Sequence, residues 1–159
     1  MKQIWAPWRL EYIKNKKEAG CVFCACVRKK NKKEALILAQ EPLSFVILNK
    51  YPYTCGHLMV IPLRHVPTLE DLSSEEGLEI FLVIQQVMKI LKKVFKPQGF
   101  NVGVNVGRAA GAGIEGHVHF HIVPRWSGDS NFMPVIGKTR VLPASLQKIY
   151  DQLFPHFQK

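Results

Sequence analysis

One nine-residue stretch, Gly116 to Pro124, constrains this chain more than any other. Three histidines, His117, His119 and His121, alternate there with apolar residues. A period of two with β-branched and aromatic residues predicts a strand with two unlike faces, the apolar one directed toward a core. Same-face residues on a strand stand about 6.5–7 Å apart, so three imidazoles in this register can meet one small anion, or one metal and one anion.

The patterns on either side of this stretch predict a mixed fold. A capping-box pair, Ser73 and Glu76, opens a helix with one apolar stripe, and Pro97 closes it. Further strands are expected over residues 36–40, 43–49, 57–61 and 100–106, and a short amphipathic helix over 143–157. The order predicts an α+β domain, in which an antiparallel sheet of about five strands carries the main helix across one face and the C-terminal helix beside it.

Length and composition predict one domain over residues 1–159. We expect an aromatic N-terminal arm (1–20), a core (21–125) and a C-terminal loop and helix (126–159). The longest apolar runs are five residues, which excludes a membrane span, and the first residues lack the apolar region of a secretory signal. A cytoplasmic location is therefore expected. In such a setting the pair Cys21 and Cys24, spaced C-x-x-C, more often binds metal or does redox work than forms a structural disulfide.

The chain carries a net charge of +10, and eight of its basic residues fall between Lys14 and Lys33. A solvated surface segment explains this run best. A positive field also raises the encounter rate with polyphosphates. The basic residues are not interleaved with aromatic ones as a nucleic-acid stacking platform requires, so a nucleic-acid partner is not expected.

The motif His-φ-His-φ-His-φ-φ, where φ is apolar, resembles that of the histidine triad (HIT) superfamily of nucleotide hydrolases and transferases. Asn49, the pair Gly56-His57 and the glycine-rich turn before the histidines also match that family. The opening Trp-Ala-Pro-Trp-Arg and the residues after Pro124 look like its diadenosine tetraphosphate phosphorylase/hydrolase-like branch. The resemblance implies a HIT-like fold and, as in most members, a homodimer.

The resemblance also implies a role for each site residue. His119 would attack an α-phosphorus and form a nucleotidyl-histidine intermediate. His121 would bond a phosphate oxygen and help the leaving group depart, while His57 would orient His121. The substrate would be bound by Asn49 at the ribose, by Ile47 at the base, and by Asn105 with the backbone N–H groups near Gly111 and Gly113 at the phosphates.

Some bacterial relatives hold zinc with residues that correspond here to Cys21, Cys24, His65 and His117. Four such ligands with no open position would make a structural zinc site. A free buried thiol pair and a redox pair are the alternatives. No organic cofactor is expected.

The function implied by the resemblance is cleavage of a dinucleoside polyphosphate at an α-phosphate, giving AMP or ADP; the choice between hydrolase and phosphorylase stays open. Two alternatives remain. One is an adenosine phosphoramidase-like hydrolase, which cleaves a P–N bond. The other is a zinc-stabilised nucleotide- or nucleic-acid-binding module without catalysis.

Overall fold

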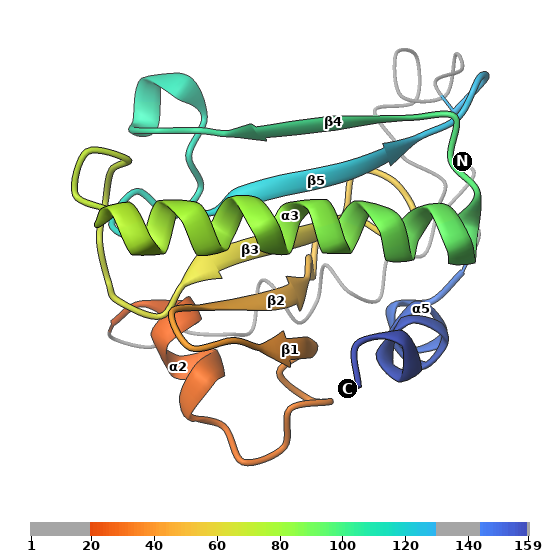
Figure 1. Cartoon of the computed structure of the whole chain (residues 1–159), viewed down its shortest axis with the longest axis horizontal. Coiled ribbons are helices and arrows are strands. Elements are labelled where there is room, and N and C mark those ends of the chain that lie inside the picture. Colours follow the sequence, from red (N-terminus) through yellow and green to blue (C-terminus); the bar gives the residue numbers. More distant parts are fainter. Residues whose placement is uncertain (1–19, 130–143, 159) are drawn as a thin grey trace, which may run out of the picture.

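Five antiparallel strands form one sheet in the order β1-β2-β3-β5-β4 (Figure 1). The computed structural model describes residues 20–129 and 144–158. The strands are β1 (Ile37–Gln40), β2 (Ser44–Leu48), β3 (Leu58–Pro62), β4 (Gly99–Val104) and β5 (Phe120–Arg125). The first four of these match the strands predicted from the sequence to within two residues at each end. The α+β class and the antiparallel sheet are confirmed.

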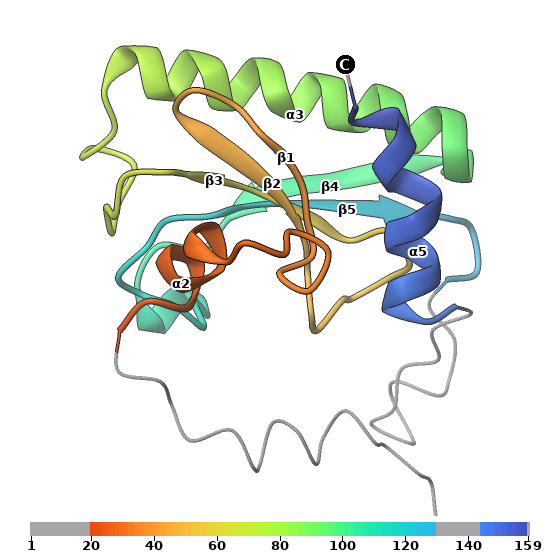
Figure 2. The ribbon, with the colours of Figure 1, turned by 90° about the horizontal axis from the view of Figure 1, so that it is seen from below.

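The main helix, α3 (Ser74–Phe95), lies across one face of the sheet (Figures 1 and 2). The predicted capping box is present, because the Ser73 side chain accepts from the Glu76 N–H and the Glu76 carboxylate accepts from the Ser73 N–H. Lys96 ends the helix in the left-handed conformation, just before a proline. The stripe buried against the sheet comprises Ile80, Val83, Ile84, Val87 and Leu91, each contributing about 1.5–3 kcal/mol by burial.

The short C-terminal helix is also confirmed. Helix α5 (Leu146–Leu153) runs into the 3-10 turn η2 (Phe154–His156), while the first residue of the predicted range, Pro143, lies outside the described residues. Ile149, Tyr150 and Leu153 of α5 complete the core beneath α3. The Tyr150 hydroxyl donates to the carbonyl of Ile37 at 3.0 Å and so attaches α5 to β1.

The opposite face of the sheet is covered by helix α2 (Val22–Arg28), as Figure 2 shows. Here a second apolar cluster joins the helix to alternate residues of the first three strands: Phe23, Ala35, Ile37, Phe45, Ile47, Met59 and Ile61. With covers on both sides, every residue of β2 and β3 is buried. This explains why their sequences, apart from Ser44 at the start of β2, are continuously apolar and do not alternate.

The C-x-x-C pair lies at the start of α2, with Cys21 as the N-cap and Cys24 in the helix. One local expectation is corrected. The histidine strand begins only at Phe120, so His121 alone of the three lies in it. The preceding residues leave the ladder because the Val118 N–H donates to the Val66 carbonyl, at 2.7 Å, in the segment that follows β3.

The basic segment after α2 is largely engaged with its own chain. The Lys32 ammonium donates to the Val27 carbonyl at 2.7 Å, and Lys33 pairs with Asp151 of α5 at 2.8 Å. These contacts fit the surface-segment interpretation. Among the described residues, no helix is both long and apolar enough to cross a membrane. The aromatic arm predicted for residues 1–20 lies, apart from Gly20, outside the described residues, and the subdivision of the chain stays a prediction.

Candidate functional site

The strand register collects the candidate site residues on the face of the sheet that α2 covers. Ile47 pairs with Met59, Met59 with His121, and His121 with Gly103, which makes one row across four strands. Ile47 and Met59 belong to the cluster beneath α2, and side chains of directly paired residues share a face. His121 therefore stands at the end of that cluster, on the side away from α3.

His119 is nearly buried, with 4% of its surface exposed. Its Nδ1 lies 2.9 Å from the carbonyl oxygen of His117. A carbonyl only accepts, so Nδ1 must carry the proton of the neutral ring. Nε2 is then left with a lone pair. Burial, opposed by this hydrogen bond, lowers the pKa of His119, so the ring stays neutral and its lone pair available at physiological pH.

His57 and His121 form a hydrogen-bonded pair, with 2.9 Å between His57 Nε2 and His121 Nδ1. The backbone N–H of Tyr53 donates to His57 Nδ1 at 3.1 Å. In neutral His57 the proton is therefore on Nε2, which donates to His121. His121 in turn accepts at Nδ1 and carries its own proton on Nε2. Burial, with a smaller effect of the charge that His119 can carry, lowers the pKa of His121 to about 4.

His119 and His121 thus offer opposite hydrogen-bonding groups at neighbouring positions. Their ring centroids are 4.9 Å apart and the planes are almost perpendicular, at 74°. One ring presents a lone pair and the other an N–H, and both are neutral. His121 is partly exposed. A Cβ atom added to its strand partner, Gly103, would meet nothing within 4 Å. The open space beside the rings is therefore on the β4 side.

The remaining residues predicted to bind substrate lie around this pair. Ile47 is 5% exposed, within the cluster under α2. Asn49 is in contact with His57, its Nδ2 lying 3.3 Å from Nδ1, while its Oδ1 accepts from the Tyr51 N–H at 2.9 Å. Asn105 directly follows Val104, the last residue of β4, and Val104 pairs with Phe120, the residue directly after His119.

The glycine-rich turn between β4 and β5 offers fewer backbone N–H donors to a substrate than expected. The N–H of Gly111 donates to Arg108 O at 2.9 Å within the 3-10 turn η1 (Arg108–Ala110), so this donor is already engaged. Gly111 also has a φ of +90°, which favours glycine on conformational grounds alone. A Cβ at Gly113 would meet nothing within 4 Å.

Cys21, Cys24, His65 and His117 form a second group, with one ligand atom from each residue lying within 4.8 Å of the others. His117 Nδ1 is 3.3 Å from the Cys21 sulfur and 3.7 Å from that of Cys24, and His65 Nδ1 is 3.5 Å from the latter. Ligand atoms around one tetrahedral zinc ion are about 3.4–3.8 Å apart, given the usual bond lengths. The group therefore fits a metal ion of that geometry.

One further feature suits a cation. His117 Nε2 donates to the carbonyl of Pro62 at 2.9 Å, which leaves the Nδ1 lone pair facing the sulfurs, as the second hydrogen bond of a metal-ligating histidine does. Burial and the neighbouring Cys21 thiol raise the pKa of Cys24. A dication among these groups would instead favour the thiolate.

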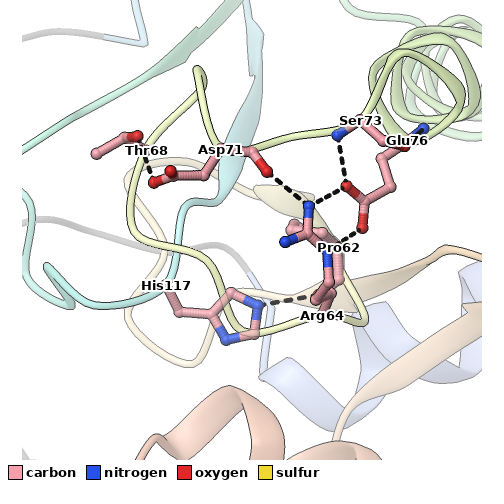
Figure 3. A network of polar contacts seen from close by, with 7 residues as sticks. All are labelled: Pro62, Arg64, Thr68, Asp71, Ser73, Glu76 and His117. Carbon is pink, nitrogen blue, oxygen red and sulfur yellow. Dashed lines mark hydrogen bonds and ion pairs between the residues drawn. The ribbon is translucent and has the colours of Figure 1, made fainter.

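An ion pair holds the segment that carries His65 (Figure 3). The Arg64 guanidinium reaches both carboxylate oxygens of Glu76, at 2.9 and 2.7 Å, and donates to the carbonyl of Asp71 at 2.6 Å. The hydrogen-bonded ion pair with Arg64 is the main reason why the pKa of Glu76 is lowered. Glu76 is also the N3 residue of the capping box of α3. The start of α3, the end of β3 and the segment that leads into His65 are thus fixed to one another.

Three residues at the site did not stand out in the sequence. Phe23 of α2 packs on both His117 and His119, at ring-centroid distances of 5.7 and 5.0 Å. Tyr53 covers the rings of His57 and His121, at 4.7 and 6.0 Å. Gly103 is the third. A glycine inside a strand often marks a close approach, so its position was a usable signal. The other two act through contacts distant in sequence.

Comparisons with known proteins place this geometry in a family. The family model of the HIT domain matches residues 30–128. The AP-4-A phosphorylase of Mycobacterium tuberculosis is 37% identical over 155 residues, covering 92% of this chain and 80% of that protein. An asymmetrical bis(5'-nucleosyl)-tetraphosphatase of Schizosaccharomyces pombe is 39% identical over 93 residues, which is 58% of this chain and 50% of the relative.

Among solved structures, a zinc-bound histidine triad family protein from Mycobacterium smegmatis superposes with a TM-score of 0.68 and 26% identity. The match covers 87% of this chain and 93% of the other. Fold, sequence and the histidine geometry agree. The chain belongs to the HIT domain family.

Proposed function

We propose that this protein cleaves dinucleoside polyphosphates at an α-phosphate through a covalent bond to His119. One observation carries the proposal: His119 and His121, with ring centroids 4.9 Å apart, present a lone pair and an N–H to the same region. The names of the two relatives, a phosphorylase of AP-4-A and a nucleosyl tetraphosphatase, support the substrate class.

The first step is a displacement at phosphorus. The Nε2 lone pair of His119 forms a bond to the α-phosphorus, and the bond from that phosphorus to the bridging oxygen breaks. The oxygen keeps the electron pair and leaves as part of a nucleotide anion. The Nε2–H of His121 hydrogen-bonds this oxygen as its charge grows. Such an anion leaves at neutral pH without being protonated.

The second step regenerates His119. Water attacking the same phosphorus releases a nucleoside monophosphate, and inorganic phosphate attacking it releases a nucleoside diphosphate. Both attacks break the bond from phosphorus to Nε2 and return its electron pair to the ring. The nature of this second nucleophile separates a hydrolase from a phosphorylase.

The neutral state of His121 suits a phosphate leaving group. A polyphosphate oxygen needs only a hydrogen bond from the ring, whereas an amine departs only once it has gained a proton. A comparison of rates on phosphoramidates and dinucleoside polyphosphates tests the phosphoramidase alternative.

The other site residues are given binding and positioning roles. His57 orients His121. Asn105 and the backbone at Gly113 contact the α-phosphate, Gly111 shapes the turn that leaves room for it, and Ile47 lies toward the base. Asn49 retains a lone pair on Oδ1 for a ribose hydroxyl, beside the one that accepts from Tyr51.

We further propose that Cys21, Cys24, His65 and His117 hold a structural zinc ion. Support comes from the sulfur–nitrogen distances, from the backbone bond of His117, and from the zinc-bound family member of similar fold. When bound, the ion would join α2 to the segment before β5. A homodimer is also proposed; three large apolar side chains of α3, Leu78, Phe81 and Leu82, are more than half exposed. The cytoplasmic location stays a prediction.

A trapped adduct tests the reaction. Mass spectrometry after brief exposure to diadenosine tetraphosphate should show one added adenylate on the protein. His119→Ala should remove the adduct and lower turnover by roughly a thousandfold or more, with the fold intact by circular dichroism. The exposed His156 offers a matched control, since His156→Ala should leave both unchanged.

Turnover that survives in His119→Ala, or a wild-type protein that never gains the added mass, would overturn the proposal. Running the reaction with and without inorganic phosphate, and identifying AMP or ADP as product, then assigns the second nucleophile.

A further inference from the structure

The pair formed by His57 and His121 has two ways to share its protons. Nε2 of His57 lies 2.9 Å from Nδ1 of His121, and either nitrogen can be the donor. In one arrangement His121 presents an Nε2–H to the substrate, and in the other it presents a lone pair. Only the first can stabilise a departing phosphate oxygen. The pair alone does not distinguish them.

We propose that Tyr53 makes this choice and is a positioning residue of the site. Its backbone N–H donates to His57 Nδ1 at 3.1 Å and forbids a proton there. His57 must then donate from Nε2, and His121 must keep its proton on the far nitrogen. The effect of Tyr53 on catalysis rests on the proposed function. The direction of the hydrogen bond from His57 to His121 does not depend on that function.

The side chain of Tyr53 reinforces the arrangement. Its ring lies 4.7 Å from that of His57 and 6.0 Å from that of His121, with an interplanar angle of 28° to the latter. The ring covers the face of the pair and limits rotation of His121. The Nδ2 of Asn49 lies 3.3 Å from His57 Nδ1 and 3.4 Å from His57 Nε2, so this donor does not favour one ring nitrogen over the other.

The loop that carries Tyr53 is fixed relative to both histidines. The Thr54 hydroxyl donates to the carbonyl of Pro124 in β5, the strand of His121, at 2.9 Å. The His57 N–H donates back to the Thr54 carbonyl at 3.3 Å. The N–H of Tyr53 is thereby held in place with respect to the whole pair, as a preorganised donor requires.

The test replaces the backbone amide of Tyr53 by an ester. Incorporation of the α-hydroxy acid analogue of tyrosine removes the N–H and keeps the ring. Nitrogen NMR of the resting protein, labelled in its histidine rings, should show His57 and His121 losing their single protonation pattern. The turnover number for diadenosine tetraphosphate should fall roughly 10- to 100-fold, with KM little changed.

Two side-chain variants serve as controls. Tyr53→Phe and Tyr53→Ala both keep the N–H, so both should keep the wild-type ring protonation. Unchanged NMR signals in the ester protein, or a shift in Tyr53→Ala equal to that in the ester, would overturn the proposal. So would altered ring protonation without loss of turnover. Because the NMR result needs no substrate, it stays informative even where the proposed reaction fails.

Discussion

At the scale of single residues, two identical side chains acquire different chemistry from the atoms behind them. His119 has a carbonyl at its Nδ1, and His121 has an N–H donor there. Nothing in the rings themselves distinguishes the two. Each hydrogen bond fixes the state of the opposite nitrogen, so one ring can act as nucleophile and the other as donor.

Gly103 provides a residue-scale prediction about access. Gly103→Val should lower kcat/KM for a dinucleoside polyphosphate roughly 100-fold, because the new side chain would fill the open space next to His121 where the departing phosphate passes. Stability should change little, since a Cβ there meets nothing within 4 Å and valine suits a strand.

Gly99 supplies the matched control. It lies in the same strand, pairs with Arg125 at the far end of β5, and has equally open surroundings. Gly99→Val should retain wild-type kinetics. Equal rate losses in the two variants, measured in steady state, would mean that the effect belongs to the strand and not to the space beside His121.

At the scale of elements, α2 brings the candidate metal group and the proposed nucleophile, His119, together. The seven-residue helix contributes the Cys24 sulfur to the group, its N-cap Cys21 contributes the other, and Phe23 packs on the ring of His119. It is too short to be stable alone. Its position therefore depends on the apolar cluster beneath it and, in our proposal, on the bound ion.

Cys24→Ala should abolish zinc binding and lower Tm by roughly 10 °C, because a structural ion contributes several kcal/mol to the folded state. Metal analysis and calorimetry measure the two effects. At a temperature where the variant is still folded, adduct formation at His119 should persist, since the acceptor for its Nδ1 is backbone.

Cys26→Ala is the control for this variant, because Cys26 lies in the same helix but outside the metal group. It should keep both zinc and Tm. Loss of adduct formation in folded Cys24→Ala would show that the ion takes part in the reaction itself.

At the scale of the whole molecule, buried neutral histidine makes stability depend on pH. The pKa of His121 is about 4 in the folded state and near 6.5 unfolded, so between these values the unfolded chain binds more protons. The free energy of unfolding should therefore fall as pH drops from 6.5 to 4, by roughly 1–2 kcal/mol from this residue, because solvent screens part of the effect at a partly exposed ring. The rings facing His121, those of His57, His119 and Tyr53, bring no negative charge to offset it.

Denaturant titrations of wild type and His121→Asn across this range isolate the effect of His121 and its direct partners, because contributions from groups that do not contact His121 cancel in the difference. The variant should show a shallower loss of stability toward low pH. Parallel curves for the two proteins would contradict the prediction.

Much of the fold could be predicted from the sequence. Local patterns sufficed for the strands, the capping box of α3 and the alternation that puts His119 and His121 on one face. The start of β5 could not be predicted this way. It is set by the backbone hydrogen bond from the Val118 N–H to the Val66 carbonyl. A local sequence pattern cannot predict a partner that lies 52 residues earlier in the chain.

The candidate site divides in the same way. Alternation predicts neighbouring histidines, yet the metal group required the family resemblance, since His65 is 41 residues from Cys24. The parts played by Phe23 and Tyr53 depend on packing and on one backbone N–H. Neither an aromatic residue between two cysteines nor a tyrosine in a loop carries a distinctive sequence signal.

The ring of His117 faces the two sulfurs of the candidate metal group, and its main-chain carbonyl accepts a hydrogen bond from His119. Every amino acid has a main-chain carbonyl. The hydrogen bond from His119 to residue 117 is therefore retained in any substitution that keeps the local backbone conformation. Relatives could therefore discard both cysteines and exchange this histidine without giving up the chemistry. Within such a lineage, ion content and catalytic competence would be inherited as independent traits.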